Sequence, residues 1–429
     1  MTAEIVIMNR LAIALAADSA VTLGGTEKIY TSADKLFLLS ESAPVGAMIY
    51  GNADLLGIPW ETIIKEFRRE SFDKVYPHLE DYVNNIIGFL CLNKMFTEEY
   101  QKNFVANIAQ SFFIYFLKNV LEPKLEEEVK KKDLTEGDIK NIIAELASKE
   151  LLETKKFPAL DELPEDFITT LKTKYEPDIK KIKQRVFQTL PLKRSTSAIL
   201  INTIYELLTR QRFGPFDSGL VIAGFGEDDY FPQIYEIRLQ GIASGRLLFY
   251  KARQDQIGST RTAVIAPFAQ QEMVYTFMEG IDPSLREMIQ ESTGTLFTGA
   301  IRIIFDLVKK KDLKCEEELN KVVTPQLNEM IQNLFKSWET KRKVDYWGPI
   351  MGIVASLPKD ELGAMAESLV NLTKFKRRVS RQQETVGGPI DVAIITKGDG
   401  FVWLKRKHYF SSEYNPRFIA KYYNSIKEG

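Results

Sequence analysis

The sequence is poor in the residues that most often carry out hydrolysis. Its 429 residues include only two histidines, His78 and His408, and only two cysteines, Cys91 and Cys315. Zinc sites use Cys and His at short, regular spacings, and a Ser-His-Asp triad needs a histidine. These four residues lie far apart and form no Cys-x-x-Cys or His-Glu-x-x-His pattern. We therefore expect no metal and no cofactor, and a chemistry that does not depend on imidazole.

The chain also lacks a long apolar run and an excess of charge of either sign. No run approaches the ~18 apolar residues needed to cross a bilayer, and the N-terminus lacks the layout of a signal peptide. Lys and Arg number 57 against 58 Asp and Glu, so no basic field attracts nucleic acid. Two basic clusters, 374–378 and 405–408, are interpreted as solvated segments, with an anionic-ligand patch as the alternative. We expect a cytoplasmic protein without a membrane or nucleic-acid partner.

Apolar patterns predict strands near both ends of the chain and long helical stretches between them. Short apolar runs predict hairpins at 4–17 and 35–50. Apolar residues at helical spacing predict a helix over 55–69 and mainly helical stretches at 75–212 and 279–357. The smaller predicted features are a tight turn at Asn9-Arg10, an N-cap at Thr135, strands at 218–224, 233–239 and 246–252, helices at 267–278 and 358–374, and a hairpin of 390–396 with 401–406.

The N-terminal residues offer a nucleophile that needs no histidine. Ala3 follows Thr2, and a small second residue allows removal of the initiator Met, which gives Thr2 a free α-amine beside its own hydroxyl. A terminal amine has an unperturbed pKa of about 7.7–8.0, so it can accept the hydroxyl proton near neutral pH. The dipeptide alone also fits an ordinary terminus, so its meaning depends on the segments that follow.

Several short segments after Thr2 form an ordered set. They are Leu15-Ala-Ala-Asp18-Ser19, Thr22-Leu-Gly24, Asp34-Lys35-Leu36 and Met48-Ile-Tyr-Gly51-Asn-Ala-Asp54. This order resembles the β-type subunits of the proteasome, and especially the bacterial proteasome-related peptidase that works with an ATP-dependent unfoldase. Thr2 and Asp18 stand sixteen positions apart, as the nucleophile and an Asp do in that family. The later segments that continue the resemblance are 222–228, 232–237, Gly258-Ser259 and 386–400.

The resemblance implies a role for each matching residue. Thr2 would be the nucleophile with its α-amine as the base, and Lys35 would place a positive charge beside it. Asp18 would hold Lys35 ionised, since a buried ammonium needs a paired carboxylate. The backbone N–H of Gly51, or of its neighbour Tyr50, would donate to the oxyanion. Each residue also has an ordinary structural reading, as a terminus, a solvated lysine, a turn carboxylate or a turn glycine.

Ser259 completes the site that the resemblance implies. In the family a Gly-Ser pair supports the nucleophile, and Gly258-Ser259 stands at the matching place. The match of Lys35 requires one inserted residue, which leaves Lys28 as the alternative lysine for the same role.

Two departures from the family pattern bear on activity. Tyr50 precedes Gly51 where the family has two glycines, so a bulky side chain adjoins the oxyanion position. The family's closing Asp-x-x-Ser-Gly-Gly reads Gln-Glu-Thr-Val-Gly-Gly over 383–388, so its Asp and Ser are missing unless Glu384 and Thr385 substitute for them. An inactive scaffold that binds a partner therefore stays open beside an active peptidase.

The resemblance implies an α+β fold, a four-layer αββα sandwich of the N-terminal nucleophile hydrolase type with two helical insertions. It implies an endopeptidase that acts on peptide or protein substrates, forms a ring-like homo-oligomer and works with an unfoldase. A small-molecule amidase on the same fold is a further alternative. The predicted organisation is 1–74 for the first part of the core, 75–212 for one helical insertion, 213–278 for the middle of the core, 279–357 for a second insertion, 358–408 for a closing helix and hairpin, and 409–429 for a tail.

Overall fold

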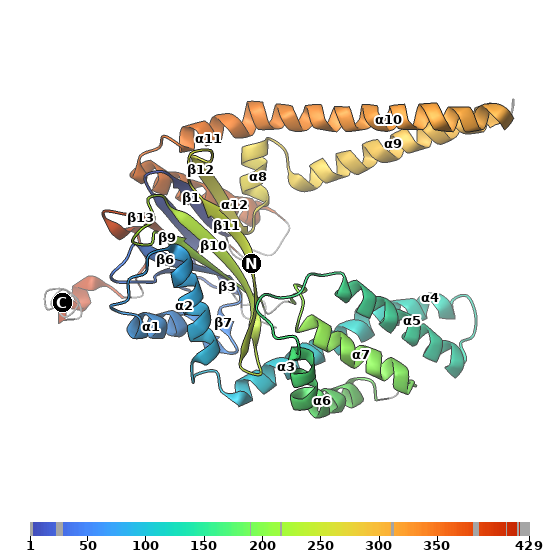
Figure 1. Cartoon of the computed structure of the whole chain (residues 1–429), viewed down its shortest axis with the longest axis horizontal. Coiled ribbons are helices and arrows are strands. Elements are labelled where there is room, and N and C mark those ends of the chain that lie inside the picture. Colours follow the sequence, from blue (N-terminus) through green and yellow to red (C-terminus); the bar gives the residue numbers. More distant parts are fainter. Residues whose placement is uncertain are drawn as a thin grey trace. The chain divides into compact units, whose positions relative to one another are not determined.

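The computed structural model describes residues 3–22, 29–188, 190–214, 217–309, 313–380, 386–408, 410–417 and 420 (Figure 1). The chain has a mixed α/β fold with antiparallel sheets, and it divides into two compact units assembled from segments that lie far apart in sequence. The predicted four-layer stacking of the sheets stays a prediction. Unit 1 consists of Met1–Ala33, Ile257–Ile394 and Val402–Gly429, and unit 2 of Asp34–Gln256 and Ile395–Phe401.

Unit 1 contains most of the sheet with the strand order β12-β1-β2-β13-β14. Strand β1 pairs antiparallel with both β2 and β12. The Asn9 N–H donates to the Ala12 carbonyl at 3.1 Å, which closes the predicted turn between β1 and β2. Every residue of these two strands is buried, as their nearly continuous apolar runs indicate. The strands are β1 (Ala3–Asn9), β2 (Ile13–Asp18), β12 (Ala263–Ala269), β13 (Ile390–Thr396) and β14 (Gly400–Lys405).

Helix α12 (Lys359–Val379) packs against β1 and β2 of this sheet. Its Leu362 and Leu369 share an apolar core with Ala14 and Ala16 of β2. Helices α9 and α10 lie side by side as a long antiparallel hairpin (Figure 1). The remaining elements of unit 1 are β3 (Val21–Thr22), β4 (Ile29–Tyr30), α8 (Glu272–Glu279), α9 (Pro283–Lys309), α10 (Leu313–Arg342), the π-helical turn η2 (Lys343–Trp347), α11 (Gly348–Val354) and the 3-10 turn η3 (Ser412–Tyr414).

Unit 2 contains a sheet with the strand order β11-β10-β9-β6-β5, in which every neighbouring pair is antiparallel. Ala47 and Ile49 of β6 lie in an apolar core with helices α1 and α2. Because side chains alternate along a strand, Met48 and Tyr50 point to the opposite face of the sheet. The strands of unit 2 are β5 (Leu36–Leu38), β6 (Val45–Gly51), β7 (Asp54–Leu55), β8 (Ile58–Pro59), β9 (Ser218–Gly224), β10 (Gln233–Ala243) and β11 (Arg246–Gln256).

A cluster of helices in unit 2 has an apolar core of its own, where the sequence predicts a mainly helical stretch. Phe113 of α3, Leu171 of α6 and Leu200 of α7 are all fully buried in it. Helix α5 packs on α7, and α3 packs on α6 (Figure 1). The helices of unit 2 are α1 (Trp60–Glu70), α2 (Leu79–Leu92), α3 (Glu98–Tyr115), the π-helical turn η1 (Phe116–Leu121), α4 (Glu122–Val129), α5 (Glu136–Lys155), α6 (Phe167–Val186) and α7 (Arg194–Leu207).

Two predicted helices begin later than their apolar patterns suggest. The helix predicted over 55–69 begins at Trp60, because β7 and β8 form a small hairpin and Leu56 adopts a positive φ of 54°. The helix predicted from 267 begins at Glu272, because Pro267 lies in strand β12. β12 is at the edge of its sheet, where a proline is tolerated because it removes no ladder donor.

One helical segment in the described part of the chain, Glu98–Val129, is long and apolar enough to cross a membrane by length and composition. This corrects the expectation that no segment has that length and hydropathy. Polar residues interrupt the segment at helical spacing, so it contains no continuous apolar run. Its most apolar window is 44% buried, and its apolar side chains contribute to the core of the helix cluster, as in a core helix of a folded protein.

Candidate active site

A buried carboxylate marks the N-terminal end of β1. Asp18 ends β2 and is only 1% exposed. Its Oδ1 accepts a hydrogen bond from the Ala3 N–H at 3.1 Å, and its Oδ2 accepts from the Ala20 N–H at 3.3 Å and the Gly387 N–H at 2.9 Å. The register of the β1–β2 hairpin brings the end of β2 beside the start of β1. The hairpin therefore anchors the residue that directly follows Thr2 in the chain.

The loop before β13 is hydrogen-bonded to Ser19, the residue that follows Asp18. The Ser19 hydroxyl donates to the Pro389 carbonyl at 2.7 Å, and the Ser19 N–H donates to the Gly387 carbonyl at 3.1 Å. Gly388 has a φ of +75°, and a Cβ there would lie 2.7 Å from the Thr31 carbonyl oxygen. Glycine is required at this position, since it alone adopts that conformation without strain and leaves room for Thr31. The Asp-Ser and Gly-Gly segments of the sequence thus meet in the structure.

A polar pair that the sequence did not reveal lies at the end of the strand opposite Ala3. Ala269 of β12 pairs with Ala3, and the next residue, Gln270, is 5% exposed. The buried Arg377 of α12 donates from Nε to Gln270 Oε1 at 2.5 Å and from Nη2 to Glu272 Oε2 at 3.2 Å. Arg377 lies on the buried face of α12. A charged residue within an apolar helical stripe is the sequence signal that could have identified this pair.

Several predicted site residues lie outside the described residues. These are the nucleophile Thr2, the alternative lysine Lys28, and the two substitutes Glu384 and Thr385. Their roles stay predictions. The hydrogen bond from the Ala3 N–H to Asp18 describes the residue that follows Thr2.

Ser259 lies at the wrong end of β1 to support the predicted nucleophile. It is exposed in the loop between β11 and β12. Strand β12 begins beside Asn9 and ends beside Ala3, so this loop adjoins the far end of β1. The Arg10 guanidinium in the β1–β2 turn donates to the Gly258 carbonyl at 3.2 Å. At a rise of about 3.3 Å per residue, the two ends of β1 lie about 20 Å apart, which corrects the role predicted for Ser259.

Lys35 and Gly51 belong to unit 2, where they lie at the same end of its sheet. Lys35 precedes β5, is 4% exposed, and its carbonyl accepts a hydrogen bond from the Ile49 N–H at 2.9 Å. Burial excludes the alternative reading of Lys35 as a solvated strand-end lysine. Gly51 ends β6 with a φ of +83°, and a Cβ there would lie 2.6 Å from the Asp217 carbonyl oxygen. The chain therefore requires glycine at this strand end.

Tyr50, the bulky residue before Gly51, is held on the sheet of unit 2 by packing and by a hydrogen bond. The Tyr50 ring lies over Gly219 so closely that a Cβ there would overlap it. Its hydroxyl donates to Glu236 Oε1, and the Arg238 guanidinium lies 5.4 Å from the ring centroid. Burial and then the neighbouring Glu236 raise the pKa of Tyr50, and burial raises the pKa of Glu236. This polar network is on the face of the sheet opposite α1 and α2.

His78 has a structural role at the start of α2. Its Nδ1 lies 3.0 Å from Asp229 Oδ1, and this hydrogen bond raises the pKa of His78. Asp229 Oδ2 also accepts from the Leu79 N–H at 2.9 Å and the Gly226 N–H at 2.8 Å. Although burial acts in the opposite direction, these hydrogen bonds lower the pKa of Asp229. No group of three or more His, Cys, Asp or Glu side chains among the described residues is arranged to hold a metal ion.

Most cations of the two basic clusters are engaged within unit 1. One donates to a backbone carbonyl of the loop beside Asp18, and others pair with carboxylates. These contacts favour a structural role over an anionic-ligand patch. The contacts are Lys374 Nζ with the Gly388 carbonyl at 2.8 Å, Lys376 with Asp282 at 3.2 Å, Lys405 with Glu367 at 2.5 Å, and Lys407 with Asp391.

Comparison with known proteins does not assign the chain to a family. No protein-family model matches it, and no curated protein matches it either. The predicted membership of the proteasome β-type subunits, or of the related bacterial threonine peptidase, is therefore wrong as a family assignment. The motifs behind it are short, and short motifs recur in unrelated chains.

A solved structure with weak similarity to the chain is the Gly-1 mutant of Anbu from Hyphomicrobium sp. strain MC1. The alignment has 10% sequence identity and covers 100% of this chain and 96% of that chain, with a TM-score of 0.29. A TM-score this low carries no argument about architecture or activity. The candidate site therefore depends on the geometry of the chain's own residues.

Proposed function

We propose that the chain is an amide-bond hydrolase with an N-terminal threonine nucleophile. The observation that carries this proposal is the buried Asp18 carboxylate, which holds the Ala3 N–H at the start of β1. That N–H belongs to the peptide group that joins Ala3 to Thr2. A carboxylate fixed by backbone donors at this point suits a chain whose first residue must be held in one position.

In the proposed mechanism, removal of Met1 gives Thr2 a free α-amine. The Thr2 hydroxyl attacks the substrate carbonyl while the amine takes its proton, and the amine then returns the proton to the leaving nitrogen. The result is an ester between Thr2 and the acyl part of the substrate. Water activated by the same amine hydrolyses the ester and restores the hydroxyl.

Two residues of unit 2 have roles in the same proposal. Lys35 supplies a positive charge that favours the deprotonated hydroxyl, and its burial supports a function beyond solvation. The N–H of Gly51 donates to the oxyanion, and a glycine at that strand end leaves room for a substrate backbone.

The proposed substrate is a peptide or an unfolded protein chain that is cut internally. A small-molecule amide is the alternative substrate for the same centre, and substrate profiling separates the two. We include self-association of the chain in the proposal, and light scattering measures it directly. A partner unfoldase and a cytoplasmic location stay predictions.

A non-catalytic scaffold is the second candidate function. Tyr50 favours it, since a bulky, buried and hydrogen-bonded side chain precedes the proposed oxyanion donor Gly51. Under this function the N-terminus needs no processing, and the helices of unit 2 bind a partner protein. The two functions make opposite predictions for Thr2.

The test is hydrolysis of a panel of fluorogenic peptides by the purified full chain and three variants. We expect Thr2→Ala to lose at least about 10³-fold in kcat/KM, because the nucleophile is gone, and Thr2→Ser to retain measurable activity. Asp18→Asn should fall between them, since the amide replaces one acceptor oxygen with a donor. Hydrolysis by Thr2→Ala at the wild-type rate would refute the mechanism. Circular dichroism of each variant controls for folding.

A further inference from the structure

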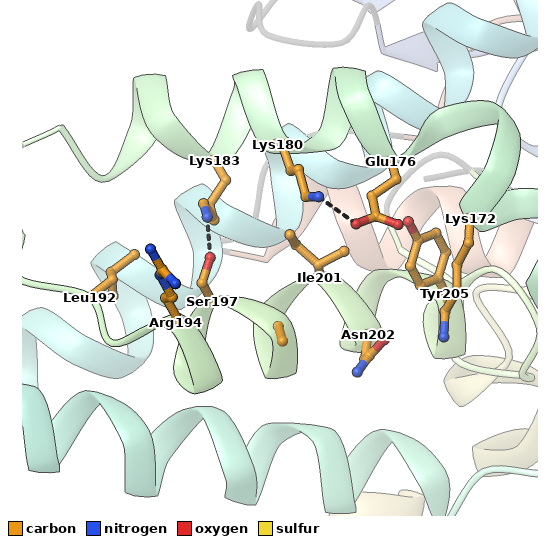
Figure 2. A pocket seen from close by; sticks show the side chains of 11 residues that line it. Lys172, Glu176, Lys180, Lys183, Leu192, Arg194, Ser197, Ile201, Asn202 and Tyr205 are labelled. Carbon is orange, nitrogen blue, oxygen red and sulfur yellow. Dashed lines mark hydrogen bonds and ion pairs between the residues drawn. The ribbon is translucent and has the colours of Figure 1, made fainter.

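A cavity of about 520 Å³ lies between α6 and α7 in the helix cluster of unit 2. Figure 2 shows charged side chains of α6 facing α7 across this space. Lys172, Lys180 and Lys183 lie on one face of α6, because positions three, four, seven or eight residues apart share a helix face. Arg194 lines the cavity from the start of α7.

The charge around this cavity is unbalanced. Four cations line it, but Glu176 is the only carboxylate among its described lining residues. Glu176 is already paired with Lys180 at 2.7 Å. Lys172, Lys183 and Arg194 form no ion pair with any carboxylate in the described part of the chain. The cavity therefore presents an excess of positive charge to whatever occupies it.

Lys183 is the cation most affected by this environment. Its Nζ donates to the Ser197 hydroxyl on the facing helix. Burial, together with the nearby Lys180 ammonium, lowers the pKa of Lys183. A partly desolvated ammonium without a paired carboxylate is unfavourable, and an anion bound beside it removes that cost.

Helix α7 adds the positive end of a 14-residue helix to the same region. The N-cap residue, Lys193, makes no side-chain hydrogen bond to the first turn. Uncapped N–H groups and the helix dipole together favour phosphate and carboxylate groups at a helix N-terminus. Arg194 and Ser197 belong to this first turn, so charge and donors converge there.

An unsatisfied hydroxyl at the other end of the cavity points to a ligand independently. Tyr205 is 2% exposed, and its hydroxyl has no hydrogen-bond partner among the residues that the structure describes. It lines the cavity beside Glu176 in Figure 2. Because buried polar groups almost always have a partner, this hydroxyl indicates a missing one. Ser197 and Tyr205 are about 12 Å apart along α7, which is longer than a single phosphate ion.

We propose that this cavity binds an organic phosphate. The phosphate group lies against Lys183, Arg194 and the start of α7, and a polar group at the other end of the molecule bonds to Tyr205. Free phosphate shares the anionic chemistry, but it cannot reach both ends of the cavity. None of these residues takes part in the proposed hydrolysis, so the site has a separate function.

Calorimetric titration of the full chain with adenosine 5′-monophosphate, glucose 6-phosphate and inorganic phosphate tests the proposal. We expect at least one ester to bind roughly tenfold tighter than inorganic phosphate. Lys183→Gln and Arg194→Gln should each weaken the ester and inorganic phosphate alike, by roughly tenfold. Tyr205→Phe should weaken the ester alone. The matched control is Lys181→Gln, which removes an exposed cation of α6 that does not line the cavity.

Three results would overturn the proposal. The first is no saturable binding of either ester up to about 10 mM. The second is equal weakening by Lys181→Gln and Lys183→Gln, which would indicate diffuse surface charge. The third is equal affinity for esters and inorganic phosphate with no effect of Tyr205→Phe, which would indicate an adventitious ion only. Thermal unfolding of each variant is measured in parallel. If Lys183→Gln does not fold, Arg194→Gln provides the test in its place, because the Arg194 side chain is exposed.

Discussion

Asp18 shows how the interior of a protein can hold a carboxylate by backbone groups. Its two oxygens accept from the N–H groups of Ala3 at the start of β1, of Ala20 just after β2, and of Gly387 in the loop before β13. An asparagine would offer one acceptor oxygen and would place an amide donor against N–H groups. The surrounding N–H groups therefore favour a carboxylate over an amide at this position. The proposed nucleophile, Thr2, directly precedes Ala3, which is one of the three donors.

The contact between Tyr50 and Gly219 leads to a stability prediction. We expect Gly219→Ala to lower the free energy of unfolding by about 1–3 kcal/mol, because the added Cβ overlaps the buried Tyr50 ring. Without that overlap, alanine is favoured over glycine in a strand. Urea unfolding of the wild type and of Gly219→Ala gives the difference.

The Tyr50→Ala background controls this prediction. There the ring is absent, so adding Gly219→Ala should cost almost nothing, and the double-mutant cycle should show a coupling that accounts for most of the single-variant loss. Equal costs in both backgrounds would contradict the contact.

At the scale of single residues, the resemblance drew attention to Asp18 through its spacing from Thr2, but no sequence pattern indicated the groups that hold it. Gly387 lies 369 positions from Asp18, and no local pattern connects them. Ser259 was misplaced for a related reason. A Gly-Ser dipeptide gives no information about which end of a neighbouring strand it adjoins, and the β1–β12 register decides that.

Capping explains where one of the helices begins. Thr135 precedes α5, its hydroxyl accepts from the Asp138 N–H at 3.2 Å, and its N–H donates to Asp138 Oδ2 at 3.0 Å. This capping box confirms the N-cap predicted from the sequence. Hydrogen bonds from Lys132 and then from Thr135 lower the pKa of Asp138, which favours the charged form of the cap.

Removal of this cap should weaken α5 locally. We expect Thr135→Ala to lower the local stability of the helix by about 1 kcal/mol, because the first turn loses its side-chain acceptor. Native-state hydrogen exchange at the amides of 139–145 measures the change. Thr135→Ser keeps the acceptor and should exchange like the wild type. Unchanged exchange in Thr135→Ala would contradict the capping role.

Among the elements, those with strong local patterns were predictable. The β1–β2 hairpin, β6 and α12 have long apolar runs or clear helical spacing, and each forms where it was predicted. Strand β12 was missed because Pro267 resembles a helix start and because β1, the strand with which it pairs in the described residues, lies far away in the sequence. The start of α1 was predicted too early, because the small β7–β8 hairpin occupies residues that have helical spacing.

For the whole molecule, the two units are discontinuous in sequence, and local patterns could not have predicted their composition. Unit 1 joins both ends of the chain to a middle segment, so its contacts depend on pairing between distant strands. Sequence periodicity reports which faces of an element are apolar, but not which distant element covers them. The long helical stretches were recognisable as helical, whereas the cavity between α6 and α7 depends on their packing.

The most direct measurement of whether Thr2 is an N-terminal nucleophile is intact-mass spectrometry after incubation with a peptide epoxyketone. This reagent requires a hydroxyl and a free α-amine on the same residue. We predict a chain that lacks Met1 and carries one adduct on Thr2, with no adduct on Thr2→Ala. A chain that retains Met1, or one that lacks Met1 and forms no adduct, would contradict the proposed function.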